Sequence, residues 1–118
     1  MELNEILAVY RKKAKFKQSE MGEKLGLTGG AYAAIEQGRT PPTIDRIFEF
    51  IDIFGEEFAL IFMLYIQNRI VKKYLSEDMN VTKEIEKEMK KGSYDIEKLL
   101  LISKKGELEI MKHIINSD

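Results

Sequence analysis

The sequence contains no cysteine, a single histidine and no long hydrophobic run, and its positive and negative charges nearly cancel. Without cysteine the chain has no disulfide framework, no thiolate metal site and no cysteine nucleophile, which favours a reducing cytoplasm. The first residues, MELNEILAVYRKKAK, lack the basic start, apolar block and small-residue cleavage site of a secretory signal peptide. We therefore expect a cytoplasmic protein.

The most apolar stretch is FALIFMLYI at residues 58–66, and it is too short to cross a membrane. A transmembrane helix needs about 20 apolar residues. Here only nine occur together, between Glu57 and Gln67. We expect no membrane association and interpret the stretch as a buried or interface helix.

The residue pattern does not favour an enzyme. The lone histidine, His113, has no carboxylate or hydroxyl partner evident from the sequence. Acidic residues near the C-terminus alternate with lysines and apolar residues, as they do on solvated helix faces. Neither a glycine-rich phosphate loop nor a metal-ligand spacing occurs. We predict no catalytic residue, no metal site and no cofactor.

The net charge of −1 is not that of a strongly basic nucleic-acid binder, but the positive charges are clustered. Five of the eight lysines and arginines in residues 1–46 fall in RKKAKFK, from Arg11 to Lys17. A local basic patch is sufficient for DNA binding, because affinity comes largely from neutralising phosphates. A lysine run also occurs on ordinary solvated helices, so the cluster alone is a weak signal.

Apolar residues recur at helical spacing along the chain, and no strand pattern competes, which predicts an all-α protein. Thr28 and Thr43 are suitable N-caps, whereas Gly26, Gly38 and Gly55 suit helix ends. Five helices are expected at about 3–14, 18–25, 29–37, 44–54 and 56–75. Three more are expected from Asn80 or Thr82 to Gly92, from Asp95 to Lys104 and from Glu107 to Ile115, the last two separated by Gly106.

Residues 18–39, QSEMGEKLGLTGGAYAAIEQGR, resemble the helix-turn-helix of the Cro/C1-type phage repressors, the XRE-like regulators. The matches include the family's helix-opening glutamine, the positions of its Leu-Ala pair, its apolar-glycine-apolar turn, its small hydroxylated cap and its apolar-Glu-polar-Gly-basic ending. They fall on Gln18, Met21, Gly22, Leu25, Gly26, Leu27, Thr28, Ile35, Glu36, Gln37, Gly38 and Arg39. The resemblance covers roughly residues 3–66. It implies a five-helix DNA-binding domain at residues 1–66, followed by a C-terminal helical extension at residues 67–118.

The resemblance also implies which residues meet DNA. Gly22 removes a side chain where the two helices cross, and Gly26 permits a positive φ in the turn. The third helix would then lie in the major groove with its N-terminal residues facing base edges, while Gln18 would reach a phosphate. The implied DNA-binding residues are Lys17, Gln18, Thr28, Gly29, Gly30, Tyr32, Ala33, Ala34, Gln37, Arg39 and Thr40.

The base-facing positions depart from the family, because Gly29, Gly30, Ala33 and Ala34 cannot hydrogen-bond a base edge. Three interpretations remain open. The helix sits deep in the groove, with phosphate contacts and DNA shape giving specificity. Alternatively, both glycines lie outside a shortened helix and Tyr32, Gln37 or Arg39 reads bases. In the third interpretation, this surface of glycines and alanines binds a protein partner.

Two residues of this segment suit structural roles better than DNA contacts. Tyr32 takes a normally apolar, inward position, which favours core packing over base stacking. Glu36 matches a family glutamate that holds the loop after the third helix. For both residues a structural role is therefore the alternative to a role in DNA binding.

Regulators of this type bind two half-sites as symmetric dimers, so a dimerisation surface is expected. Residues 58–66 cover more of a helix than one small domain could bury, and the tail carries its own apolar stripe. We predict that they form a helical module for dimerisation or partner binding. Its residues are Phe58, Ile61, Phe62, Tyr65, Leu99, Ile102, Ile110 and Ile114. The simpler alternative is a C-terminal extension of a monomer's core.

Together these features predict a DNA-binding transcription regulator, of the repressor kind, that acts as a homodimer on double-stranded DNA. The rival hypothesis is a protein-interaction module with the same fold, such as an antirepressor, antitoxin or adaptor. The missing base-reading side chains and the acidic pI favour the rival. The basic run, Gln18 and Arg39 favour DNA.

Overall fold

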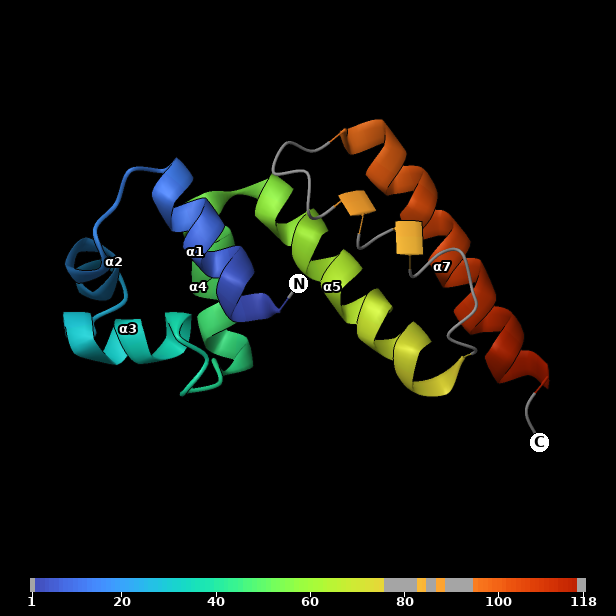
Figure 1. Cartoon of the computed structure of the whole chain (residues 1–118), viewed down its shortest axis with the longest axis horizontal. Helices are drawn as coiled ribbons and strands as arrows, with labels where there is room; N and C mark the ends of the chain where they lie inside the picture. Colours follow the sequence, from blue (N-terminus) through green and yellow to red (C-terminus); the bar gives the residue numbers. More distant parts are fainter. Residues whose placement is uncertain (1, 76–82, 85–86, 89–94, 117–118) are drawn as a thin grey trace. The chain divides into compact units, whose positions relative to one another are not determined.

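The computed structural model describes residues 2–75, 83–84, 87–88 and 95–116, and these ranges contain helices but no strand (Figure 1). The prediction of an all-α fold is therefore confirmed. The helices with defined bounds are α1 (Leu3–Lys13), α2 (Gln18–Lys24), α3 (Gly29–Glu36), α4 (Ile44–Phe54), α5 (Glu56–Tyr74) and α7 (Ile96–Asn116). The first five follow the predicted ranges to within a residue or two. The helix expected up to Gly92 falls largely outside the described residues.

Side-chain caps and glycines set the helix ends, as the sequence predicted. Thr28 Oγ1 accepts a hydrogen bond of 3.0 Å from the Ala31 backbone N–H, and Thr43 Oγ1 accepts one of 3.2 Å from Arg46. Such a cap stabilises a helix by about 1 kcal/mol. Gly55 follows α4 with a φ of +92°, a conformation that a side chain would strain.

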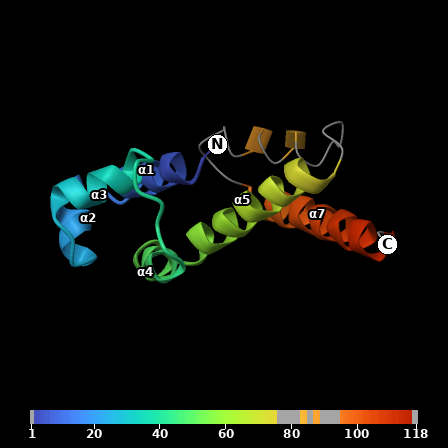
Figure 2. The same ribbon diagram turned by 90° about the horizontal axis from the view of Figure 1, so that it is seen from below.

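The chain divides into two compact units, and the boundary between Ile61 and Phe62 lies inside α5. The first unit holds α1 to α4 and the first turns of α5. Within it α2 packs against α3, and α1 also contacts α3, as Figures 1 and 2 show. The second unit holds the rest of α5 and α7.

An aromatic cluster forms the centre of the first unit. The Tyr10 ring lies 5.4 Å from that of Phe58, and the Tyr32 ring lies 6.4 Å from that of Phe50. Phe50 and Phe58 are themselves 6.4 Å apart, between ring centroids. Each fully buried side chain of this kind stabilises the fold by roughly 2–3 kcal/mol. The cluster therefore joins α1, α3, α4 and α5 and fixes the helix pair α2–α3 on a rigid base.

In the second unit, α7 continues through Gly106, so the prediction of two helices separated there is wrong. A helical glycine costs about 1 kcal/mol relative to alanine, which tertiary packing can outweigh. Gly106 is buried, as are Leu99 and Ile102 on the same side of the helix. The Gln67 side chain on α5 donates to the Ser103 carbonyl oxygen at 3.3 Å. Packing of this face holds the helix continuous.

Candidate nucleic-acid interface

The crossing of α2 and α3 depends on Gly22. A Cβ atom at this position would lie 2.8 Å from the Thr28 carbonyl oxygen and 2.9 Å from that of Leu27. Both neighbours are backbone atoms, so they cannot turn aside. Gly26 adopts a φ of +69° in the turn between the helices. Both predicted glycine roles are therefore confirmed, and the two helices meet as closely as their backbones allow.

Helix α3 begins at Gly29, directly after the Thr28 cap, so both Gly29 and Gly30 are helical. The interpretation that placed them outside a shortened helix is wrong. Gly29 and Gly30 are helical because the Thr28 hydroxyl caps the first turn of α3. This cap offsets the low helix propensity of the two glycines.

The outer face of α3 carries no side chain longer than a methyl group along its first turns. A Cβ at Gly30 would meet open space, and Ala31 is exposed. Ala33 and Ala34 are half-buried. Gly29 is different, since its missing Cβ would lie 3.3 Å from the Ser19 Cα of α2. The exposed surface of the helix is therefore its own backbone and small groups.

Tyr32 cannot contact DNA, because its side chain is 0% exposed. It was included among the DNA-binding candidates, and the structure corrects this in favour of core packing against Phe50. Its hydroxyl is buried without a hydrogen bond. Burial therefore raises the pKa of Tyr32 above its ordinary value, and the neighbouring Glu36 carboxylate adds to the effect.

Glu36 joins α3 to α1 through a buried ion pair. Arg11 donates from Nε and from a terminal nitrogen to the two Glu36 carboxylate oxygens, each at 2.8 Å. The Glu36 side chain is only 6% exposed. Burial alone works to raise the pKa of Glu36, but the Arg11 hydrogen bonds and charge outweigh it and the pKa is lowered. The structural interpretation of Glu36 is supported, although its carboxylate holds α1 rather than the loop.

Gln18 belongs to the same cluster. Its side-chain nitrogen donates to Glu36 Oε1 at 3.4 Å, and the residue is half-buried at the first position of α2. The amide predicted to reach a phosphate is thus directed at Glu36. Arg11, which the sequence placed in a basic run, was not predicted as a structural residue. Its 25-residue separation from Glu36 gave no local signal.

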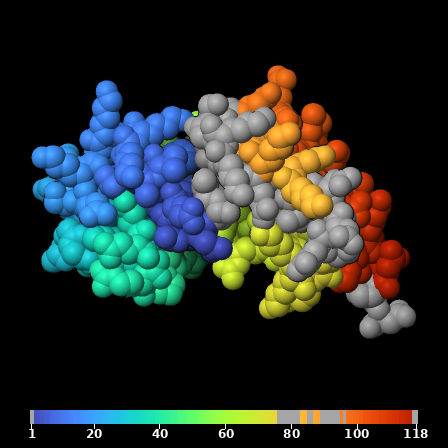
Figure 3. Space-filling model, in the orientation of Figure 1, coloured from blue at the N-terminus to red at the C-terminus, as the bar shows by residue number. Residues whose placement is uncertain are grey.

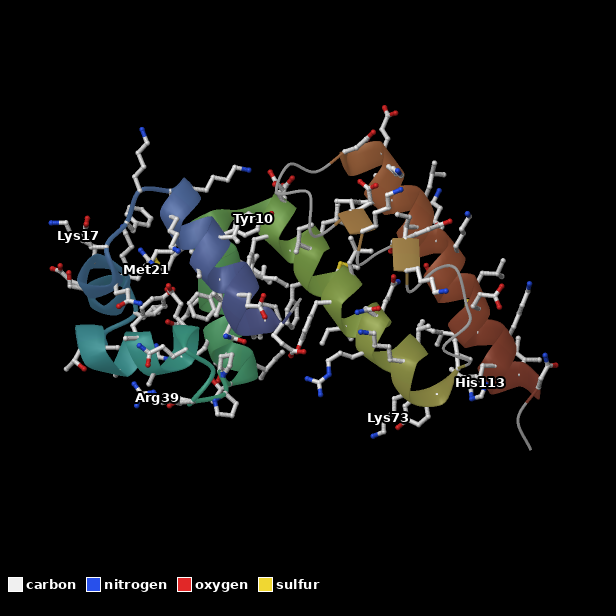
Figure 4. All side chains as sticks on the ribbon, viewed as in Figure 1. Tyr10, Lys17, Met21, Arg39, Lys73 and His113 are labelled. Carbon is white, nitrogen blue, oxygen red and sulfur yellow. The ribbon has the colours of Figure 1, made fainter. Side chains whose placement is uncertain are left out.

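The exposed cations lie around the helix pair. Lys12, Lys15 and Lys17 are exposed, and Lys15 has a φ of +63° in the loop between α1 and α2. Figure 4 shows Lys17 beside α2 and Arg39 beyond the end of α3, both directed away from the core. Arg39 donates to the exposed Gln37 side chain at 3.0 Å. These cationic side chains are therefore accessible at the surface of the first unit.

A shallow groove of about 260 Å³ runs beside α3. Ala31 and Ala34 form one wall, and the loop at Thr40 to Thr43 forms the other. Arg46 also lines the groove, and it donates to the Leu25 carbonyl oxygen at 2.7 Å. The loop that follows the third helix is therefore fixed next to its exposed face.

The residues predicted for dimerisation lie mostly inside the chain. Phe58, Ile61 and Leu99 are fully buried, Ile102 is 3% exposed and Tyr65 is 7% exposed. They are core residues of a single chain, which corrects their assignment to a dimer surface, because the helices of each unit already cover them. Phe62 and Ile110 are half-buried, and Ile114 is 64% exposed.

The family comparison agrees with this geometry. Residues 7–61, just under half of the chain, match the family model described as helix-turn-helix. The match supports the resemblance of this segment to the Cro/C1-type helix-turn-helix family, whose members are DNA-binding transcription regulators. No curated protein and no solved structure gives a significant match to the chain.

No described helix is long and apolar enough to cross a membrane. In the same ranges, no group of three acidic or histidine residues is arranged to hold a metal ion.

Proposed function

We propose that this protein is a transcription regulator that binds double-stranded DNA as a homodimer, with α3 lying unusually deep in the major groove. The observation that carries the proposal is the outer face of a capped, rigidly held α3, on which Gly30 and Ala31 present no projecting side chain. A helix with so little bulk can approach the base edges closely.

Specificity then comes mainly from phosphate contacts and DNA shape. Glycine and alanine have no hydrogen-bonding side chain, although an alanine methyl can touch a thymine methyl. Lys17 and Arg39 are exposed at the two ends of the helix pair and are suited to phosphates. Thr40 is exposed in the following loop and takes the same role. Gln37 is exposed directly after α3, and its side-chain amide is suited to a base edge.

Repression is the proposed regulatory outcome. A dimer with one such domain on each half-site covers the DNA between two successive major grooves. Occupation of a promoter by this dimer blocks access to it. The protein-interaction alternative is not proposed, since the match of residues 7–61 to a DNA-binding family does not favour it.

The test is enrichment of genomic DNA fragments by the full chain, with fragments from around its own promoter included. Bound fragments are recovered at moderate salt and sequenced, and each is then tested singly against random DNA. The proposal predicts a few fragments that bind well above random DNA. Binding no tighter than to random DNA, even at low salt, would overturn it.

A further inference from the structure

Helix α7 carries an exposed apolar stripe, defined here as Leu101, Leu108, Met111 and Ile115. Their exposed fractions range from 51% for Met111 to 75% for Ile115. Large apolar patches are uncommon on monomeric proteins and mark interaction surfaces. The helix reaches the surface of its unit, coloured orange to red in Figure 3.

The α7 stripe lies opposite the face that the chain itself buries. Leu99, Ile102 and Gly106 are buried, and none of them belongs to the stripe. The helix therefore has two apolar faces, one used within the unit and one exposed.

The spacing of the stripe is that of a coiled-coil seam. Leu101, Leu108 and Ile115 are seven residues apart, and Met111 lies three residues after Leu108. In a heptad these are the a and d positions, which insert into holes on a facing helix. A groove of about 490 Å³ adjoins Leu101 and Leu108 and is also lined by Lys104 and Lys105.

We propose that the α7 stripe is the homodimer seam, and that two copies of α7 pair parallel and in register. This inference rests on the proposed function, because it supplies the dimer that two half-sites require. It replaces the dimer surface expected from the sequence, whose residues are mostly core. Ile114 is the one of those residues that adjoins the stripe and stays exposed.

The flanking charges favour a second copy in the parallel orientation. Glu107 precedes Leu108 at the g position, whereas Lys105 and Lys112 occupy e positions. In a parallel pair, Glu107 of one helix faces the partner's Lys112, and the reverse pair forms by symmetry. An antiparallel pair would place lysine against lysine. Pairs at e and g positions set the orientation of coiled coils.

Lys104 is the polar residue within the seam, at the d position before Leu108. In the parallel register the two copies of this lysine face each other, which weakens the dimer. Its side chain is exposed, so the ammonium group can extend into water while the stem covers the seam. A single polar core residue of this kind fixes register at a cost in stability.

The experiment measures the oligomeric state of the full chain by sedimentation equilibrium over a range of concentrations, without DNA. The wild type is expected to dimerise reversibly, and Leu108→Lys to weaken the dimer by roughly 100-fold or more. Ile44→Glu is the matched control, because Ile44 is also an exposed apolar residue, at 63%, but lies on α4. Circular dichroism confirms that each variant is folded.

Two further variants test the register and remain informative if Leu108→Lys fails to fold. Lys104→Leu should tighten the dimer by about tenfold or more, since it completes the seam. Lys112→Glu should weaken a parallel dimer, and Glu107→Lys added to it should restore association. A monomer at every concentration, a dimer unaffected by Leu108→Lys, or a dimer tightened by Lys112→Glu would overturn the proposal. Because these measurements contain no DNA, a failure of the dimer proposal can be distinguished from a failure of the proposed DNA binding.

Discussion

Arg11 and Glu36 connect α1 to the end of α3 through two hydrogen bonds of 2.8 Å each, with both side chains largely buried. The pair lies directly behind the helix that is proposed to enter the major groove. Its geometry therefore fixes how α3 is presented, while the outer face of α3 remains free of bulky groups.

Loss of Arg11 should destabilise the first unit strongly. Arg11→Ala leaves a buried carboxylate without its partner, and we expect a loss of about 3 kcal/mol or more in the free energy of unfolding. The double variant Arg11→Met, Glu36→Leu should cost clearly less than the sum of the single changes, because no uncompensated charge remains. Urea unfolding measures both. If the cost of the double variant equals the sum of the costs of its two single changes, this would contradict the coupling between Arg11 and Glu36.

The same pair should give a component of acid sensitivity. The pKa of Glu36 is lowered in the folded chain, below about 4.3, the ordinary value in an unfolded chain. The stabilisation by the ionised Glu36 carboxylate is therefore complete when the pH is above the pKa of Glu36 in the unfolded chain. It is lost as the pH falls through the lower pKa of Glu36 in the folded chain. The difference in unfolding free energy between wild type and Glu36→Gln should shrink from about pH 5 downward. A difference that is constant with pH would contradict this assignment.

Alanine at two glycines should have opposite effects on stability. Gly22→Ala places a Cβ within 3 Å of two backbone carbonyl oxygens, and we expect a destabilisation of roughly 1–3 kcal/mol. Gly30→Ala meets open space within α3 and should stabilise by up to about 1 kcal/mol. Thermal unfolding of the two variants gives the comparison. Equal effects would argue against the close crossing of α2 and α3.

A long side chain on α3 should interfere with DNA binding. Gly30→Gln adds a side chain to the face that is proposed to approach the bases, and we expect the affinity for the selected fragment to fall by roughly tenfold, which equals 1.4 kcal/mol. Gly30→Ala is the matched control, because it changes the same position without a long side chain. Fluorescence anisotropy measures both. Unchanged affinity for Gly30→Gln would mean that this face does not meet DNA.

The sequence predicted local features well where a residue type has a single strong conformational reason. Thr28 and Thr43 cap their helices, and Gly26 has a positive φ, because each role depends on neighbours close in the chain. The family resemblance at residues 18–39 also agreed with the match over residues 7–61. These signals are local and therefore visible in sequence.

Features that depend on tertiary packing were not predictable in the same way. Gly106 suggested a helix end, but burial of its face keeps α7 continuous. The apolar spacing of α7 does not reveal which of its two faces the chain covers, so the prediction of a dimer surface at Leu99 and Ile102 is wrong. The sequence places Arg11 in a run of basic residues, and no residue near it in the chain indicates that its partner is Glu36.

The most direct test of the account is the salt dependence of DNA affinity for wild type and for the Lys17→Ala, Arg39→Ala double variant. On a log–log plot the wild-type affinity should fall steeply with salt, and the double variant should lose about one unit of slope per removed phosphate contact. The Lys72→Ala, Lys73→Ala double variant removes two exposed lysines outside residues 7–61, so it is the charge-matched control and should leave the slope unchanged. Specific binding with these slopes would support a DNA-binding regulator. Equal slopes in all three proteins, or no specific binding, would contradict it.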